Sequence, residues 1–343
     1  MRAPLSRRRE MRIRTSQALL ACAAMSAAVL SGCAEKGDTG DKAAEDYPSK
    51  SISYVIPFDP GGESDVTARL QQKLLEKELG QKVVVSNKEG GGGAVAWSEL
   101  ANQAKPDGHT IMGANLPHVV LQPLARKDAG YETDDIKWAY LFQETPGALI
   151  VPKDSPYKTL DDFVQAAKKK KMSIGGSATF SANHMGTLKL NKEAGIKSTY
   201  VPFSGTAAVT PALLGGDIDA AMGYNTSALE MEDKGVRVLG FASDERLDAF
   251  PDVPTFKEEG YDLATASAWR GVAVPPDTPD AVVNKIAKAF EKVNQDPKLK
   301  KKLNELGYLP MDMGPKEAKK FVDERKAPER ALLKEYGLLN SEE

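Results

Sequence analysis

The chain has 343 residues, of which 41% are hydrophobic, and this is enough length and apolar content for two folded domains. Its formal net charge of −2 at pH 7 argues against nucleic acid as the partner, because nucleic-acid-binding domains are strongly basic. Two cysteines and three histidines leave little material for a disulfide framework, a metal centre or a catalytic thiol.

The first 32 residues have the composition of a secretory signal. Six arginines precede residue 15, and residues 17–30 form an apolar run. This run is too short for a membrane span, which needs ~20 apolar residues. A signal peptide over residues 1–32 accounts for both features. Its removal takes away six arginines and one glutamate, so the remaining body is more acidic than the whole chain.

The signal ends in Leu-Ser-Gly-Cys at residues 30–33, which resembles a bacterial lipobox. This resemblance implies cleavage before Cys33 and attachment of lipid to its sulfur; the alternative is an ordinary secretory signal with a chance cysteine. Cys22 lies within the apolar run and would be removed. Residues 33–47 are polar and lack an apolar period, which predicts a flexible tether. We therefore expect a periplasmic, membrane-anchored lipoprotein.

Strands and helices alternate in the first part of the body, residues 48–148. Alternating or β-branched runs predict strands, and apolar positions at helical spacing predict helices. The predicted strands are 51–57, 82–86 and 109–114, and the helices between them are 64–79 and about 94–104. This strand-helix order implies a parallel sheet with helices on both faces.

A second unit of the same kind is predicted over residues 149–266. Its helix at 159–170 opens with Thr159 and has Asp162 three residues on, close to a capping box. The predicted strands are 148–152, 172–176, 198–203, 218–223 and 236–243. A strand at 264–274 then returns the chain to the first unit, and residues 267–343 complete it with helices at about 278–294, 296–306, 315–325 and 328–336. We expect an α/β fold of two lobes with a ligand cleft between them.

Three predicted strand-to-helix turns have the chemistry of an anion site. They are the Pro- and Gly-rich turn 57–65, the Gly-Ser turn 175–181 and the Ser-Gly-Thr turn 203–206. The first N–H groups of a helix have no partner within it, and the helix dipole adds positive potential there. Glycines allow a ligand to approach the backbone closely. A carboxylate is therefore the ligand that these turns favour.

Segments 57–70 (PFDPGGESDVTARL), 79–93 (LGQKVVVSNKEGGGG) and 105–109 (KPDGH) resemble the substrate-binding proteins of tripartite tricarboxylate transporters, the Bug family. Segments 175–184 and 250–261 continue the resemblance, which covers nearly all of residues 50–340 in order. The departures are Phe203, where Tyr is common in the family, His109, also in place of Tyr, and Glu63, an acid beside the expected anion site. The match is poor over 113–124, which contains His118.

The resemblance implies a two-lobed periplasmic-binding-protein fold (Venus flytrap, type II-like), with the ligand carboxylate held mainly by backbone N–H groups. The ligand-binding residues that it implies are Phe58, Gly61, Gly62, Ser177, Thr179, Ser181, Ser204 and Thr206. Two further candidates are Asp65 and His184. Asp65 is first a helix cap; its alternative role, binding an amino group, would require an amino-acid ligand.

The implied function is capture of a small carboxylate, either a di- or tricarboxylate or an aromatic acid, for integral-membrane transporter subunits. The alternatives are a ligand-sensing partner of a membrane receptor and an amino-acid-binding protein of the same fold. We expect a monomer with no cofactor, no metal and no catalytic residue. The sequence has no nucleophile elbow, zinc motif or phosphate-binding loop, which argues against an enzyme. A catalytic pair of Ser181 and His184 is the alternative, but a histidine packed where a loop meets a helix is far more common.

Overall fold

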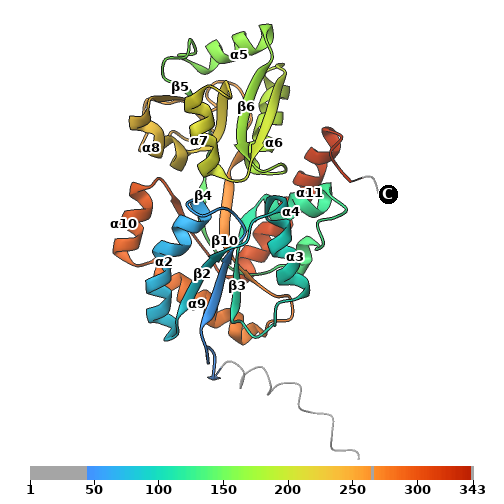
Figure 1. The fold of residues 1–343 in the computed structure, drawn as a ribbon, viewed down its shortest axis with the longest axis vertical. Helices are drawn as coiled ribbons and strands as arrows, with labels where there is room; N and C mark the ends of the chain where they lie inside the picture. Colours follow the sequence, from blue (N-terminus) through green and yellow to red (C-terminus); the bar gives the residue numbers. More distant parts are fainter. Residues whose placement is uncertain (1–44, 264–265, 341–343) are drawn as a thin grey trace, which may run out of the picture.

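The structure is a computed structural model that describes residues 45–263 and 266–340 (Figure 1). Two α/β lobes lie one above the other, and the chain passes from the first lobe to the second and back. The expected signal peptide, the lipid anchor at Cys33 and most of the tether fall outside the described residues. Within the described residues, no helix combines the length and hydropathy that a membrane span needs.

Lobe 1 is built on a six-stranded sheet with the order β11-β4-β10-β3-β1-β2. Its strands are β1 (Ile52–Ile56), β2 (Val83–Asn87), β3 (Thr110–Leu116), β4 (Lys137–Thr145), β10 (Ala268–Val274) and β11 (Leu309–Met313). Strand β1 pairs in parallel with β2 and β3, as predicted. Strand β10 pairs antiparallel with β3 and β4, so the expectation of a parallel sheet was wrong for this half. Strands β4 and β11 were not predicted.

Lobe 2 is built on a five-stranded sheet with the order β7-β6-β8-β5-β9. Its strands are β5 (Gly147–Pro152), β6 (Met172–Ser177), β7 (Ser198–Phe203), β8 (Ala220–Tyr224) and β9 (Val236–Phe241). Strand β6 pairs in parallel with β7 and β8, whereas β5 pairs antiparallel with β8 and β9. Both lobes are therefore mixed sheets. In each lobe the parallel strands supply the strand-to-helix turns that the sequence singled out.

Helices cover the sheets of both lobes (Figure 1). They are α2 (Glu63–Leu79), α3 (Ala94–Asn102), α4 (His118–Ala125), α5 (Leu160–Lys169), α6 (Ala182–Glu193), α7 (Thr206–Gly215), α8 (Asn225–Met231), α9 (Asp280–Asn294), α10 (Pro297–Glu305) and α11 (Pro315–Glu335). The predicted capping box of Thr159 and Asp162 is confirmed at the start of α5. The two helices predicted over 315–325 and 328–336 are one continuous helix, with Pro328 inside it.

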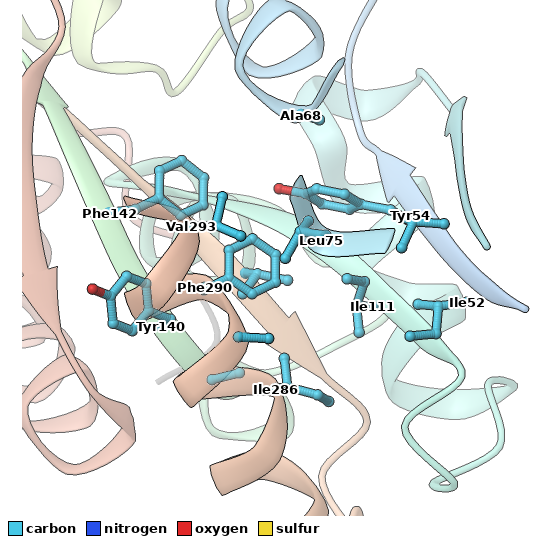
Figure 2. Close-up of a cluster of buried hydrophobic side chains, with 14 of the residues drawn as sticks. Ile52, Tyr54, Ala68, Leu75, Ile111, Tyr140, Phe142, Ile286, Phe290 and Val293 are labelled. Atoms are coloured by element: carbon cyan, nitrogen blue, oxygen red, sulfur yellow. The ribbon is translucent and has the colours of Figure 1, made fainter. Parts of the chain in front are cut away.

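The core of lobe 1 is centred on Phe290 of α9 (Figure 2). Its ring stacks on Phe142 of β4 at 6.0 Å with an interplanar angle of 7°, and it meets Tyr54 of β1 edge-on at 5.9 Å. Burying one such side chain contributes about 1.5–3 kcal/mol. Because β1 and β4 belong to the first predicted unit and α9 follows the second, this core joins the N-terminal and C-terminal parts of the chain.

Helix α11 connects the two lobes away from the sheets. Leu332 and Leu333 pack in one cluster with Leu121 of α4 in lobe 1 and Met185 of α6 in lobe 2. This contact explains why the helix continues past Pro328, because ending it there would leave both leucines without their partners. Glu329, on the same stretch, is 4% exposed, and its Oε2 has no hydrogen-bond partner within the described chain.

We predict that Glu329→Gln stabilises the protein above neutral pH. Burial raises the pKa of Glu329 from 4.5 to about 7, while Lys189 and Arg325 partly oppose the shift. Folding thus takes up a proton at Glu329, and stability present below pH 4.5 is lost as the pH rises through 7. In urea unfolding the variant should gain about 3 kcal/mol over the wild type at pH 8 and almost nothing at pH 4.

Glu324→Gln, on the exposed part of the same helix, provides the control, and it should change stability by less than about 0.5 kcal/mol at either pH. A gain for Glu329→Gln that does not depend on pH would contradict the assignment of a buried, protonated carboxyl group.

Candidate functional site

A cavity lies between the lobes where the first and third predicted turns face each other. Its lining residues come from both lobes and are Phe58, Asp59, Gly62, Glu63, Ser64, Asn115, His118, Ser177, Gly205, Thr206, Tyr224 and Arg270. The volume is about 30 Å³, which leaves room for about two water molecules. A groove of about 460 Å³ shares Glu63 and Thr206 with this cavity and also borders both lobes.

Four of the predicted ligand residues line the cavity directly. Phe58 and Gly62 contribute from lobe 1, and Ser177 and Thr206 from lobe 2. Gly61 borders the adjacent groove instead. The structure therefore brings together residues that are up to about 150 positions apart in the sequence, because β1, β6 and β7 end at the cleft.

Two predicted residues make contacts between the lobes beside the cavity. Ser204 Oγ donates to Oδ2 of Asp59, and the carbonyl oxygen of Thr179 accepts a hydrogen bond of 2.9 Å from Gln122 Nε2. Thr179 thus presents its backbone, not its hydroxyl group, to lobe 1. Together with the small cavity, these bonds describe lobes that are closed on each other.

Ser181 and His184 lie off the cavity and have structural roles. Ser181 is the N-cap of α6, where its Oγ accepts from the N–H of His184 at 3.2 Å and donates to the carbonyl of Ser177 at 2.8 Å. His184 accepts the N–H of Phe180 at its Nδ1, and its ring packs on Tyr200 at 4.6 Å. Burial lowers the pKa of His184 to about 4, so the ring is neutral. Neither residue lines the cavity.

The first turn differs from the predicted backbone cradle. The N–H of Gly61 donates to Asp65 Oδ2 at 2.9 Å, and the N–H of Gly62 donates to the Asp59 carbonyl at 3.3 Å. Both glycine N–H groups are thus already in use. The helix N-cap is Gly62 and the first N–H bonded within the helix is that of Val66, so the next N–H groups without an intrahelical partner belong to Glu63, Ser64 and Asp65.

Asp65 stabilises the first turn and does not line the cavity. Its side chain is 3% exposed, and its Oδ2 accepts both from Gly61 and from Arg69 Nε at 2.9 Å. Asp65 is not the N-cap that was expected, since Gly62 occupies that position. The positive φ of 79° at Gly61 explains why glycine is needed there.

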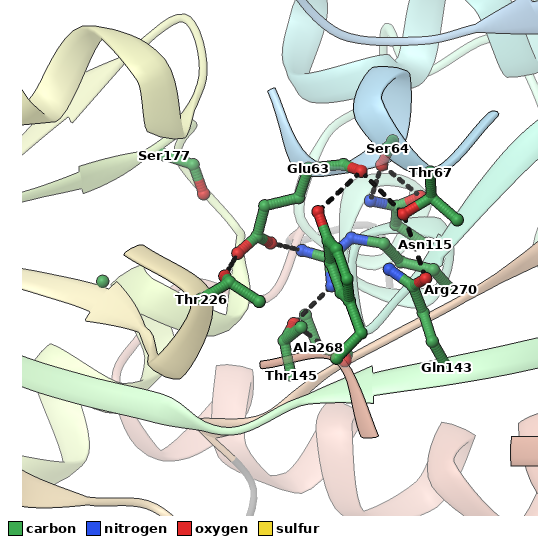
Figure 3. A network of polar contacts seen from close by, with 12 residues as sticks. Glu63, Ser64, Thr67, Asn115, Gln143, Thr145, Ser177, Thr226, Ala268 and Arg270 are labelled. Carbon is green, nitrogen blue, oxygen red and sulfur yellow. Dashed lines mark hydrogen bonds and ion pairs between the residues drawn. The ribbon is translucent and has the colours of Figure 1, made fainter. Parts of the chain in front are cut away.

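The sequence did not predict the charged pair at the centre of the cleft (Figure 3). Arg270 of β10 forms an ion pair through its Nη2 with Oε2 of Glu63 and donates through Nη1 to Oγ1 of Thr145. Oε1 of Glu63 accepts from the hydroxyl of Thr226 in lobe 2. The guanidinium of Arg270 lies 5.1 Å from the ring centroid of Tyr224. One carboxylate therefore joins a strand of lobe 1 to a helix of lobe 2.

The surroundings of this pair are poor in positive charge. Burial raises the pKa of Glu63 to about 7, against the attraction of Arg270. Burial, assisted by Arg270, lowers the pKa of His118 to about 3, so this histidine is neutral at physiological pH. A hydrogen bond to Asp59 raises the pKa of Glu89. The cleft and its edge thus bring together three carboxyl groups and one guanidinium group.

A larger groove of about 620 Å³ lies within lobe 1, lined by Trp138, Val283 and Val322 among others. Its charged side chains pair with each other, as Lys137 does with Asp280 and Lys319 with Asp323. Because no residue of lobe 2 borders it, the interlobe cavity remains the candidate ligand site.

Comparisons with known proteins agree on one family. A family described as the tripartite tricarboxylate transporter family receptor matches residues 67–338. A UPF0065 protein of Pseudomonas sp. strain P51 is 31% identical over 269 residues, which are 76% of this chain and 79% of that protein. MatC of Rhodopseudomonas palustris with bound malate is similar at 28% identity and a TM-score of 0.77, over 84% of this chain and 100% of that one. An R. palustris protein with adipate is similar at 25% identity and a TM-score of 0.80, over 85% of this chain and 99% of that one.

We predict that Arg270→Met destabilises the protein strongly and in a pH-dependent way. The substitution removes the only cation beside Glu63 among the described cavity residues, and breaking a buried pair costs about 3–5 kcal/mol. The loss should appear in urea unfolding at pH 8 and be smaller at pH 5, where Glu63 is protonated.

Arg246→Met is the matched control, because the pair of Arg246 with Glu258 is exposed and contributes less than about 1 kcal/mol. Equal losses for the two variants, or a loss for Arg270→Met that is the same at both pH values, would contradict a buried pair.

Proposed function

This chain belongs to the tripartite tricarboxylate transporter receptor family, and from that premise we propose that it captures a small carboxylate between its lobes and delivers it to a membrane transporter. Members of the family are solute-binding proteins and not enzymes, and the fold is that of the two-lobed periplasmic binding proteins. The predicted resemblance and fold class are thus confirmed. The ligand, the transporter and the membrane anchor are parts of the proposal.

The observation that carries the proposal is the meeting of two helix N-termini at one interlobe cavity. Helix α2 begins at Glu63 in lobe 1, and α7 begins at Thr206 in lobe 2. Each presents N–H groups without intrahelical partners and the positive end of its dipole. Two similar proteins hold malate and adipate, and a carboxylate of such an acid would suit a helix N-terminus of this kind.

Binding requires the lobes to separate and close again. A cavity of about 30 Å³ has no room for an organic acid, and hydrogen bonds such as that of Ser204 to Asp59 hold the lobes together. Two-lobed proteins of this kind move about hinges where the chain crosses between the lobes. We propose that a lipid anchor at Cys33 and a flexible tether over 33–47 hold the monomer near its transporter subunits.

We predict that at least one small carboxylate raises the melting temperature of the purified protein. The panel is malate, adipate, citrate and benzoate, which covers di- and tricarboxylates and an aromatic acid. A ligand at a hundredfold excess over its Kd should add about 2.7 kcal/mol of stability. No shift with any small organic carboxylate would count against a carboxylate-binding function.

We also predict that a disulfide between the lobes blocks ligand exchange. A Cβ at Gly205 would lie 3.7 Å from the Cβ of Asp59, which is close to the mean Cβ separation of about 3.8 Å in disulfides. The double variant Asp59→Cys and Gly205→Cys, made with Cys22→Ala and Cys33→Ala, should bind ligand when reduced and not when oxidised. The single variants should bind equally in both states, and unchanged binding by the oxidised double variant would disprove entry between the lobes.

A further inference from the structure

The charge of the cleft is unusual for a site that takes only carboxylates. Among the described residues that line the cavity, Asp59 and Glu63 are acidic and Arg270 is the one cation, since His118 is neutral. A dicarboxylate would bring two more negative charges into this region, where water screens them little.

We propose that the cleft selects a zwitterion, an organic acid that also carries an ammonium group, with Arg270 facing its carboxylate and Glu63 facing its ammonium. This inference rests on the proposed function and names the class of ligand for the same site. It assigns to Glu63 the role that the sequence offered to Asp65, whose Oδ2 accepts from Gly61 and Arg69 and which does not line the cavity.

Arg270 has hydrogen-bonding capacity left for a ligand. The residue lines the cavity and is 3% exposed, yet its Nε has no hydrogen-bond partner in the described chain. A guanidinium group offers five N–H donors, and the bonds to Glu63 and Thr145 use two of them. A buried donor without a partner is costly, and a ligand carboxylate would satisfy it.

Glu63 also has acceptor capacity that the closed protein does not use. Its carboxylate offers about four lone-pair positions, and the contacts with Arg270 and Thr226 take two. One oxygen of Asp59, Oδ1, is buried and likewise has no partner in the described chain. An ammonium group has three donors and no acceptor, so it matches these oxygens, whereas a second carboxylate does not.

When a carboxylate binds beside the pair of Glu63 and Arg270, its negative charge has to be compensated. When a ligand carboxylate approaches Arg270, it competes with Glu63 for the same guanidinium group. Glu63 is 9% exposed and would then be a buried carboxylate that shares its counter-ion. A ligand ammonium supplies the missing positive charge, and the site with its ligand then has the same net charge as the empty site.

The groove beside the cavity gives no alternative source of positive charge. Glu230 and Glu305 border it, and their cationic neighbours, Lys234 and Lys302, are exposed partners on the same helical segments. The described residues of the cavity and the groove offer no second cationic side chain, so a compensating unit charge would come with the ligand or as a proton on Glu63.

The test compares acids that differ at one substituent. Succinate, malate and aspartate carry hydrogen, hydroxyl and ammonium at the same carbon; propionate, lactate and alanine form the same series with one carboxylate. Calorimetry on the whole protein at pH 8 should show tighter binding of the acid that carries an ammonium group in at least one series. Aspartate, or alanine, should bind at least tenfold more tightly than the two other acids of its series. Glu63→Gln should reduce that preference to less than twofold, and Glu63→Asp should retain part of it.

Glu324→Gln is the control, because this carboxylate is exposed on α11 and borders neither the cavity nor the groove beside it, and it should leave the preference unchanged. If the acids without an ammonium group bind as tightly as those with it, the inference is wrong and the proposed function stands. If no member of either series and no carboxylate of the wider panel binds, both fail. An ammonium preference that survives in folded Glu63→Gln would remove Glu63 from the role assigned to it.

Discussion

The insertion of β10 between β3 and β4 is the constraint on which both lobes depend. The strand arrives from lobe 2 and pairs antiparallel on both sides, with Arg270 opposite Asn115 on β3 and Gln143 on β4. Gly271 allows this close fit, since a Cβ there would lie 2.2 Å from the carbonyl oxygen of Tyr140. Lobe 1 therefore cannot complete its sheet until the chain has passed through lobe 2, and the cleft is a consequence of that path.

The same insertion places a guanidinium group beside the start of α2. The resulting pair with Glu63 is buried, and such pairs add little net stability because both charges lose their hydration. The fold would tolerate apolar residues in place of both partners together, so the position of the pair at a ligand cleft favours a role in recognition. Thr226 extends the pair to lobe 2, which links the charge state of the cleft to lobe closure.

Much of the architecture could be predicted from the sequence because its signals are local. The strand-to-helix alternation, the glycine that ends α2 at Gly80 and the capping box at Thr159 each depend on a few neighbouring residues. Strands β4 and β11 escaped prediction because their identity depends on pairing with distant strands. The break predicted before Pro328 was wrong because contacts with α4 and α6 stabilise the continuous helix.

The site was predictable only in part, for the same reason. Turn chemistry pointed to Phe58, Gly62, Ser177 and Thr206, which do line the cavity. Ser181 is a serine of the same turn as Ser177, yet its hydroxyl caps α6. No local sequence pattern distinguishes a serine that caps a helix from one that lines the cavity. Arg270 gave no signal at all, because it lies in a strand expected to be apolar and only the sheet register directs it to Glu63.

Hydrogen exchange tests the central claim, capture of a carboxylate between two helix starts, most directly. With the carboxylate that gives the largest thermal shift, amides 63–65 of lobe 1 and 205–207 of lobe 2 should become protected together. Protection confined to one lobe, or located at the lobe 1 groove around Trp138, would contradict the account.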